Sequence, residues 1–288
     1  MVKIDHSRLN CYQQCPFKYY LTNELGLIKR TIDESNVDRE FGKYVHSSLA
    51  RIYRGKIDEA LKVWDSYKEA ELSEEVECTK TKENGIKLIE AYIKDNLAKD
   101  KQQLKILDVE KLYETPITDE VIWQSKVDTA IEQNENIYSL EHKTTGKMAY
   151  NYFYQFSPNQ QITGQVFSLQ YHLKQCSGVI VNAMEVGFRK RAYKGEEAGF
   201  HCKFAREIIN RNKEQIEDFK SNVLLWTKRL IKSKEANEWG KVESACHSFR
   251  GCSMKEICLT SVGLKLDEEI VEVLYRKQAN PLAYLEES

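Results

Sequence analysis

Two carboxylates and one lysine lie in neighbouring runs of the sequence that alternate apolar and polar residues. Asp128 belongs to the run Val121–Gln133, and Glu141 and Lys143 belong to the run 137–144. Since alternate side chains of a β-strand share a face, Glu141 and Lys143 are expected to point the same way. Carboxylate oxygens are the ligands that Mg²⁺ and Mn²⁺ prefer, and a fixed ammonium stabilises the charge that develops on a phosphate during hydrolysis. The pattern therefore indicates a divalent-metal site suited to phosphodiester hydrolysis.

The same residues have a plainer interpretation, in which solvated acids and a Glu-x-Lys pair lie on an exposed sheet face. The chemical interpretation requires the two runs to pair as a hairpin across residues 134–136. That pairing would bring Asp128 to the face of Glu141 and leave His142 on the other side. The hypothesis thus depends on the elements that position these residues.

Apolar residues at helical spacing predict helices at 41–54, 60–70, 86–97, 160–174 and 205–232. Alternating or continuous apolar runs predict strands at 106–109, 115–118, 121–133, 137–144 and 179–186. Residues 7–21 are expected to form a short helix, a break at Pro16 and a second, aromatic helix. The predicted fold is α/β, with the central order helix, three strands, helix, strand.

Composition narrows the class of protein. The chain has 288 residues, 41% hydrophobic and 30% charged, which is typical of a soluble globular protein. Its formal net charge of −1 argues mildly against a passive DNA-coating protein, whose affinity comes from neutralising phosphates. The first residues lack an apolar signal core, and no run approaches the roughly 20 apolar residues that span a membrane. We expect a cytoplasmic protein with no membrane partner.

If the protein is intracellular, its eight cysteines are not expected to form a disulfide framework. Three of them form the cluster Cys246-x5-Cys252-x5-Cys258. Four thiolates are the usual ligands of a [4Fe–4S] cluster or of a structural zinc ion, so one ligand is missing locally. The alternative is three thiols that happen to share a loop and a helix. Three further cysteines, Cys78, Cys176 and Cys202, are interpreted as buried thiols.

The order of elements resembles the core of the PD-(D/E)xK nuclease superfamily. Within it the chain looks most like the RecB-type nucleases, including AddB-like and CRISPR-adaptation exonucleases that carry an iron–sulfur cluster. The resemblance implies a restriction-endonuclease-like core with an N-terminal helical region and a cysteine-rich C-terminal segment. It implies one RecB-type domain over residues 1–288, with a helical insertion or subdomain at 47–104 and an iron–sulfur segment at 246–258 joined by Cys15.

The resemblance also assigns residues to a nuclease site. Gly42-x-x-x-His46 on a helix is similar to the motif whose histidine ligates a catalytic metal, so His46, Asp128 and Glu141 are expected to hold one or two Mg²⁺ or Mn²⁺ ions. Asp128, Glu141 and Lys143 are the expected catalytic set. Gln161 matches a glutamine that assists in positioning, on the helix after the third strand. Gly164 and Gln165 lie where relatives often read Gly-Tyr.

The missing sulfur ligand also comes from the resemblance. Cys15 precedes Pro16, as in the N-terminal Cys-Pro motif of the iron–sulfur RecB-type nucleases, and it would complete the set with Cys246, Cys252 and Cys258. Cys11 is a competitor four residues earlier that lacks the following proline. Zinc is the alternative to iron. Either group would join the two ends of the chain and add to folding stability.

The expected function is that of a metal-dependent deoxyribonuclease, an exonuclease on single-stranded DNA or DNA ends. It would serve recombination, repair or CRISPR adaptation in a bacterium, an archaeon or a virus-infected cell. A helicase, a recombinase or an adaptation complex is the expected partner, since the sequence carries no Walker motif for unwinding. The rival hypothesis is a catalytically silent or zinc-stabilised module that holds DNA ends for a partner.

Overall fold

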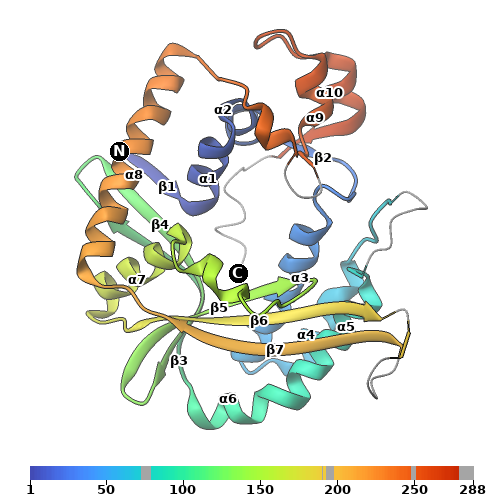
Figure 1. Cartoon of the computed structure of the whole chain (residues 1–288), viewed down its shortest axis with the longest axis vertical. Helices are drawn as coiled ribbons and strands as arrows, with labels where there is room; N and C mark the ends of the chain where they lie inside the picture. The colour runs from blue at the N-terminus through green and yellow to red at the C-terminus, as the bar shows by residue number, and fades with distance from the viewer. Residues whose placement is uncertain (73–78, 190, 193–197, 248–250, 279–288) are drawn as a thin grey trace.

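A mixed sheet forms the centre of the protein in the computed structural model, which describes residues 1–72, 79–189, 191–192, 198–247 and 251–278 (Figure 1). Within these residues the sheet has six strands, and the path β1-β4-β5-β6-β7 gives their order, with β3 paired to the other edge of β4. The strands are β1 Val2–Asp5, β3 Lys105–Pro116, β4 Val121–Gln133, β5 Asn136–Thr145, β6 Gly178–Arg189 and β7 Gly199–Ile209.

The hairpin predicted between the two chemically suggestive runs is present as β4 and β5. Its turn residues Asn134 and Glu135 have φ values of 49° and 63°. Two consecutive left-handed residues are what a type I′ turn requires, and this turn matches the twist of the strands it joins. The turn therefore fixes the register of β4 against β5 from Gln133↔Asn136 onward.

Strand β4 has different partners at its two ends. Antiparallel β3 pairs along most of its length, whereas on the other edge parallel β1 covers the start and antiparallel β5 covers the end. Strand β5 continues past this point and pairs in parallel with β6, from Tyr138↔Gly178 to Thr145↔Glu185. The two strands that carry the predicted acids thus diverge in the middle of the sheet.

Helices cover both faces of the sheet (Figure 1). Alternation along β6 explains this, because Val179 and Val181 pack with α7 on one face and Met184 and Val186 pack with α3 and α5 on the other. Of the described residues in 47–104, Leu49, Trp64 and Leu88 belong to the core on this second face. The helical elements up to β6 are α1 His6–Gln14, α2 Pro16–Tyr19, η1 Tyr20–Glu24, α3 Val37–Tyr53, α4 Ile57–Ala60, η2 Lys62–Ser66, α5 Lys82–Tyr92, η3 Ile93–Leu97, α6 Ala98–Gln103, η4 Tyr152–Phe156 and α7 Gln160–Leu173.

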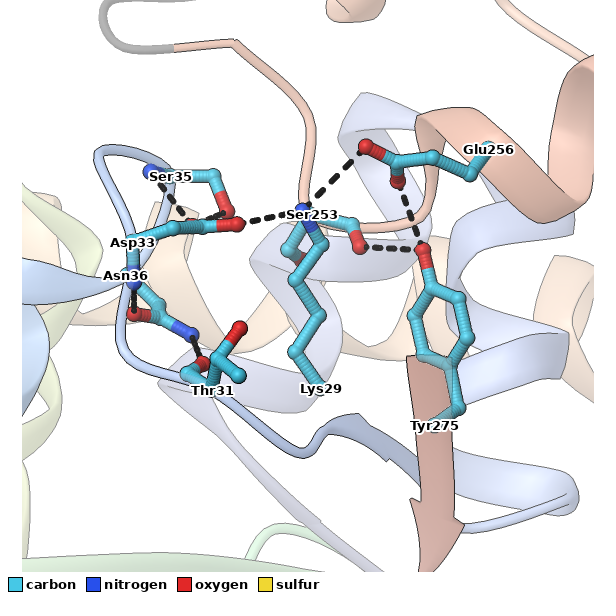
Figure 2. Close-up of polar contacts among 8 residues, drawn as sticks. All are labelled: Lys29, Thr31, Asp33, Ser35, Asn36, Ser253, Glu256 and Tyr275. Atoms are coloured by element: carbon cyan, nitrogen blue, oxygen red, sulfur yellow. Dashed lines mark hydrogen bonds and ion pairs between the residues drawn. The ribbon is translucent and has the colours of Figure 1, made fainter. Parts of the chain in front are cut away.

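The C-terminal part packs against the N-terminal part. After β7 come α8 Lys213–Ala236, η5 Glu243–His247, α9 Lys255–Thr260, α10 Glu268–Leu274 and β8 Tyr275–Lys277. Strand β8 pairs antiparallel with β2 Leu27–Lys29, so the two parts share a small sheet. Figure 2 shows the polar contacts beside it, in which Glu256 accepts from Lys29 Nζ at 3.3 Å and from Tyr275 Oη at 2.7 Å. The Tyr275 hydroxyl also lies 2.9 Å from the carbonyl oxygen of Ser253.

The α/β class and the central order of elements are confirmed, but three local predictions are wrong. Residues 60–70 do not form one helix, because α4 ends at Ala60, the 3₁₀ turn η2 follows, and Tyr67 is already extended. The helix expected at 205–232 begins only at Lys213, since Gly199–Ile209 is strand β7. The predicted strands at 106–109 and 115–118 are parts of the single strand β3. No helix among the described residues is long and apolar enough to cross a membrane.

Candidate active site and metal centre

The site lies where β4 and β5 diverge. The last pair of their ladder is Thr129↔Leu140, beyond which Asp128 lies on one strand and Glu141 on the other. At this point a side chain replaces the missing ladder bond, because Asp128 Oδ2 accepts from the backbone N–H of His142 at 2.8 Å. The divergence gives the side chain of Asp128 room between the strands and fixes its orientation.

Three potential metal ligands converge beside this gap. One ligand atom each from His46, Glu110 and Asp128 lies within 4.8 Å of the other two. His46 reaches the gap from α3, and its Nδ1 lies 3.2 Å from Asp128 Oδ1. Glu110 comes from β3, where the flanking pairs Val109↔Thr129 and Lys111↔Val127 place it opposite Asp128, and its φ is 54°. Its carboxylate also pairs with Lys126 at 3.1 Å.

The charges of this cluster are strongly coupled. Burial alone would lower the pKa of His46, but Asp128 outweighs burial, with help from Glu141 and Glu110, and raises it to about 9. Burial would raise the pKa of Asp128, yet His46, His142 and Lys143 hold this pKa well below its usual range. Burial and the neighbouring Asp128 raise the pKa of Glu110.

Two carboxylates and an imidazole form a donor set that fits a hard divalent cation such as Mg²⁺ or Mn²⁺. The raised pKa of His46 shows that the group already attracts positive charge. In the metal-free protein a proton on the imidazole supplies that charge, and a cation would displace the proton. The predicted ligands His46 and Asp128 are thus brought together, and Glu110 joins them.

Glu141 lies in a second group, on the side of the sheet that faces α7. Its carboxylate is 1% exposed and pairs with Lys143 Nζ at 2.5 Å. Gln161 Nε2 donates to Glu141 Oε1 at 2.8 Å, and Gln165 Nε2 donates to Glu141 Oε2. Lys143 Nζ in turn donates to Gln161 Oε1 at 2.9 Å. Gln161 and Gln165 are one helical turn apart on the same face of α7, and therefore both can donate to the carboxylate of Glu141.

A close approach of α7 to the sheet makes these contacts possible. Asn159 caps the helix by accepting from the N–H of Ile162 at 3.2 Å, which sets where the helix starts. One turn later a Cβ on Gly164 would lie 2.4 Å from Nε1 of Trp123 on β4. Since only glycine fits there, the helix can lie close enough for both glutamines to reach Glu141.

The two groups lie within electrostatic range of each other. Glu141 helps to raise the pKa of His46, and Lys143 helps to lower the pKa of Asp128. Burial would lower the pKa of Lys143, but Glu141 and Asp128 raise it, so its ammonium stays charged. Glu141 is not among the three ligands that share the 4.8 Å cluster, and its role as a metal ligand stays a prediction.

His142 points to the opposite face from Glu141 and Lys143, as the alternation predicts. Its ring stacks on Tyr53 of α3 with a centroid distance of 5.5 Å. Asn182 of β6 lies 2.9 Å from His142 Nδ1 and accepts from Arg206 Nε at 3.0 Å. Arg206 then makes two bonds to the buried Asp100, at 2.6 and 2.8 Å. This network ties the strand of the site to the helices behind it.

Three residues of this region were not singled out from the sequence. Glu110 and Asp100 look like ordinary acids in charged surroundings. His6, at the start of α1, is the third. Burial lowers the pKa of His6, the charge of Lys143 lowers it further, and a hydrogen bond with Gln160 opposes the shift, which leaves the pKa at about 4. Its position beside Lys143 and Gln160 depends on the pairing of β1 with β4, and the four residues of β1 gave no recognisable strand pattern.

The cysteines predicted to bind a cluster lie in one part of the fold. Cys15, Cys252 and Cys258 belong to or pack against the same apolar cluster. Burial raises the pKa of Cys258, Lys241 opposes this, and the thiols of Cys246, Cys15 and Cys252 raise it further. In kind, these four thiols are a donor set for a thiolate-ligated iron–sulfur cluster or for zinc.

Over the described part of the chain, no three cysteine sulfurs lie within 4.8 Å of one another. Burial raises the pKa of the Cys11 thiol, and Cys15 and Cys252 raise it further, so Cys11 lies within electrostatic range of these two cysteines.

The three remaining cysteines were all interpreted as buried thiols. Cys176 is buried at 8% exposure, as predicted. Cys202 is only partly buried, so its interpretation as a buried thiol is wrong. It lies on β7, which is the last strand along the path of the sheet. Cys78 lies outside the described residues.

Comparisons with known proteins find structural neighbours of low sequence identity. No curated protein gives a significant match to the sequence. A candidate exonuclease from Eubacterium rectale aligns in structure over 84% of this chain and 85% of its own, with 11% identity and a TM-score of 0.48. An alkaline exonuclease from Laribacter hongkongensis aligns over 69% of this chain and 95% of its own, with 11% identity and a TM-score of 0.30.

The model of one family matches most of the chain. It is described as the PD-(D/E)XK nuclease superfamily, and it aligns with residues 4–259, from β1 through α9. The aligned part includes the diverging strands, both groups of site residues and the four cysteines. The mixed sheet with helices on both faces is the restriction-endonuclease-like fold of that superfamily, and the chain belongs to the PD-(D/E)XK nuclease superfamily.

Proposed function

We propose that this protein is a divalent-metal-dependent DNA nuclease of the RecB type. The observation that carries the proposal is the convergence of His46, Glu110 and Asp128 beside a buried Glu141–Lys143 pair, at the point where β4 and β5 separate. A cation bound by the first group would neutralise charge on a phosphate and activate water for attack. The second group supplies a fixed ammonium for the charge that develops on the phosphate.

The residues of the second group have distinct roles in this proposal. Lys143 orients the attacking water and stabilises developing negative charge. Gln161 positions Lys143 and Glu141 together, since its amide contacts both. Gln165 holds the other oxygen of Glu141 and takes the place of the tyrosine that relatives have. Glu141 would turn toward the cation or hold Lys143 in place.

The proposed substrate is single-stranded DNA or a DNA end, and the proposed mode is exonucleolytic. Recombination, repair and CRISPR adaptation are the processes that use such an enzyme, with a helicase, a recombinase or an adaptation complex as partner. The family match and the grouped site residues together support this substrate class.

We further propose that Cys15, Cys246, Cys252 and Cys258 hold a [4Fe–4S] cluster. The apolar cluster that Cys15, Cys252 and Cys258 share supports a common group, and zinc is the alternative to iron. The cluster would be architectural, since it lies with the small β2–β8 sheet and not with the residues around Asp128.

A labelled-end digestion assay tests the nuclease proposal. Single-stranded and duplex DNA carrying a label at either end are incubated with Mg²⁺, with Mn²⁺ or with a chelator. We expect metal-dependent release of short products and loss of cleavage in Asp128→Asn and Lys143→Ala. A folded wild-type protein that binds DNA ends but never cleaves them would instead favour the silent end-binding module. Retained cleavage in folded Asp128→Asn would remove the assigned site.

A further inference from the structure

The segment 146–159, which links β5 to α7, begins and ends at the candidate site (Figure 1). Lys143 near its start donates to Gln161 near its end at 2.9 Å, so the base of the segment is closed. Tyr152 and Phe153, in the middle of the segment, pack against the core that includes Ile162 and Val166 of α7. The middle of the segment therefore lies against the helix that carries Gln161 and Gln165.

The segment is also held in place. The N–H of Met148 donates to Glu185 Oε2 at 2.7 Å, and Arg211 Nη2 donates to the carbonyl oxygen of Phe156 at 2.8 Å. The Phe156 side chain is 4% exposed and belongs to the core that lies under α7. A segment anchored at both ends can present a surface of fixed shape.

Aromatic residues of this segment divide into an inner and an outer set. Tyr152 and Phe153 are half-buried and pack on one another at 5.3 Å. Tyr150 and Tyr154 are 96% and 69% exposed. A single exposed tyrosine on a protein surface needs no explanation. Two exposed rings within five residues, next to charged groups suited to phosphate chemistry, require a partner that uses both features.

Unpaired nucleic-acid bases have the chemistry that fits such rings. A base stacks on an aromatic side chain whatever its identity, and tyrosine loses little rotamer freedom when it is immobilised. Bases inside a duplex are already stacked on one another and cannot reach the rings. Lys147, exposed in the same segment, can contact the backbone of the strand.

We infer that Tyr150 and Tyr154 form a stacking platform for unpaired bases, and that this platform makes the site prefer single-stranded DNA over duplex. The inference rests on the proposed nuclease function and deepens it, because it assigns the selection of the strand to two residues outside the catalytic set.

Fluorescence anisotropy in the non-cleaving Asp128→Asn background tests the platform. The probes are a labelled oligo(dT) and an abasic strand of the same length, which has the same phosphates but no bases. We expect the Tyr150→Ala/Tyr154→Ala double variant to lose at least tenfold in affinity for oligo(dT), since each stacked base contributes about 5- to 150-fold. The matching Phe variants should bind like the parent, because phenylalanine retains the stacking face.

Two controls make the result specific. Binding of the abasic strand should be the same in the parent and in the double variant. Tyr171→Ala removes a ring that is 48% exposed on α7. Tyr171 lies ten residues along α7 from Gln161, about 15 Å away, so its loss should leave oligo(dT) binding unchanged.

Unchanged oligo(dT) binding in the double variant would overturn the platform, and so would an equal loss on the abasic strand. Cleavage by the wild-type protein, measured alongside, separates the two levels of the argument. If the wild type digests DNA but the double variant keeps the full preference for single strands, the platform fails and the nuclease stands. If the wild type never cleaves while the base-dependent binding is lost in the double variant, the platform stands and the catalytic proposal fails.

Discussion

Glu110 reaches the candidate metal centre because it lies opposite Asp128 in the sheet. The pairs Val109↔Thr129 and Lys111↔Val127 flank this position, and the carboxylate of Glu110 joins His46 and Asp128 within 4.8 Å. The sequence could not reveal this neighbour, because the pairing register of β3 with β4 is not visible in the pattern of either strand. The predicted pair His46 and Asp128 could be found because a family motif links them, whereas no motif pointed to the third ligand.

Glu110→Gln should therefore weaken metal binding. An amide keeps the size of the side chain but removes a negative charge from a site for a divalent ion. We expect the Mn²⁺ concentration for half-maximal cleavage to rise about tenfold or more, in line with losses at residues around metal sites. Glu114→Gln is the matched control on the same strand, since Glu114 pairs with Lys3 at the surface. An equal response in both variants would show that Glu110 does not hold the metal.

The pH dependence of metal binding follows from His46. Its pKa rises from 6.5 to about 9 in the metal-free protein, so the protonated pair with Asp128 stabilises the fold fully below pH 6.5. That stabilisation is lost as the pH rises toward 9. A metal ion must displace the proton, so its own stabilising effect should grow over the same window.

The shift in melting temperature that Mn²⁺ causes should therefore be larger at pH 8.5 than at pH 6.5. Differential scanning fluorimetry with and without Mn²⁺ at a series of pH values measures it. His46→Gln should show a smaller shift with little pH dependence, because glutamine carries no proton to displace. A wild-type shift that is constant across this window would contradict a metal-binding His46.

At the scale of elements, the helices and strands that carry the catalytic set could be predicted because each has a strong local pattern. Strand β7 could not be predicted. Its residues 205–209 are as compatible with a charged helix as with a strand, and pairing with β6 decides between them. The network from His142 to Asp100 was equally hidden, because Arg206 belongs to the misassigned strand.

Helix α7 must approach the sheet closely if its glutamines are to hold Glu141. Gly164→Ala places a Cβ 2.4 Å from Trp123 Nε1, so either the helix or the indole must move. We expect a loss of about 1–3 kcal/mol in unfolding free energy, together with slower cleavage. Chemical denaturation and the digestion assay measure the two effects.

Gly42→Ala tests whether this result reflects packing and not the loss of any glycine. A Cβ on Gly42 would lie 3.9 Å from Thr144 Oγ1, an ordinary contact, and alanine favours a helix over glycine by about 1 kcal/mol. The stability of this variant should be unchanged or higher. If Gly164→Ala were equally stable, the close approach of α7 would not limit the fold.

At the scale of the whole molecule, the two ends of the chain are joined in several ways that need no metal. Strand β2 pairs with β8, Phe17 N–H donates to Gly240 O at 2.9 Å, and the Tyr275–Glu256 contact shown in Figure 2 lies beside them. The sequence predicted only the cysteine link, because a cysteine cluster is visible as a motif. Pairing of two three-residue strands nearly 250 residues apart leaves no such trace.

The cysteine cluster and these contacts can be separated by experiment. Anaerobically purified protein should be brown and contain about four irons per chain if the cubane form is present. Cys15→Ser or Cys258→Ser should bleach it and lower its thermal stability. Cys176→Ser should keep the iron, because Cys176 lies in the core under α7. Cys11→Ser decides between the two N-terminal candidates, and loss of iron there with retention in Cys15→Ser would reassign the ligand.

Tyr275→Phe supplies the complementary variant. It removes the bonds of the hydroxyl to Glu256 and to Ser253 O, which should cost about 1–2 kcal/mol of unfolding free energy. Its iron content should stay at the wild-type level, because Tyr275 is not a sulfur ligand. Metal analysis with an absorbance spectrum checks both predictions. Colourless protein with one zinc per chain would replace iron by zinc, and protein without any bound metal would leave the β2–β8 pairing and the other hydrogen-bonded and apolar contacts to join the two ends.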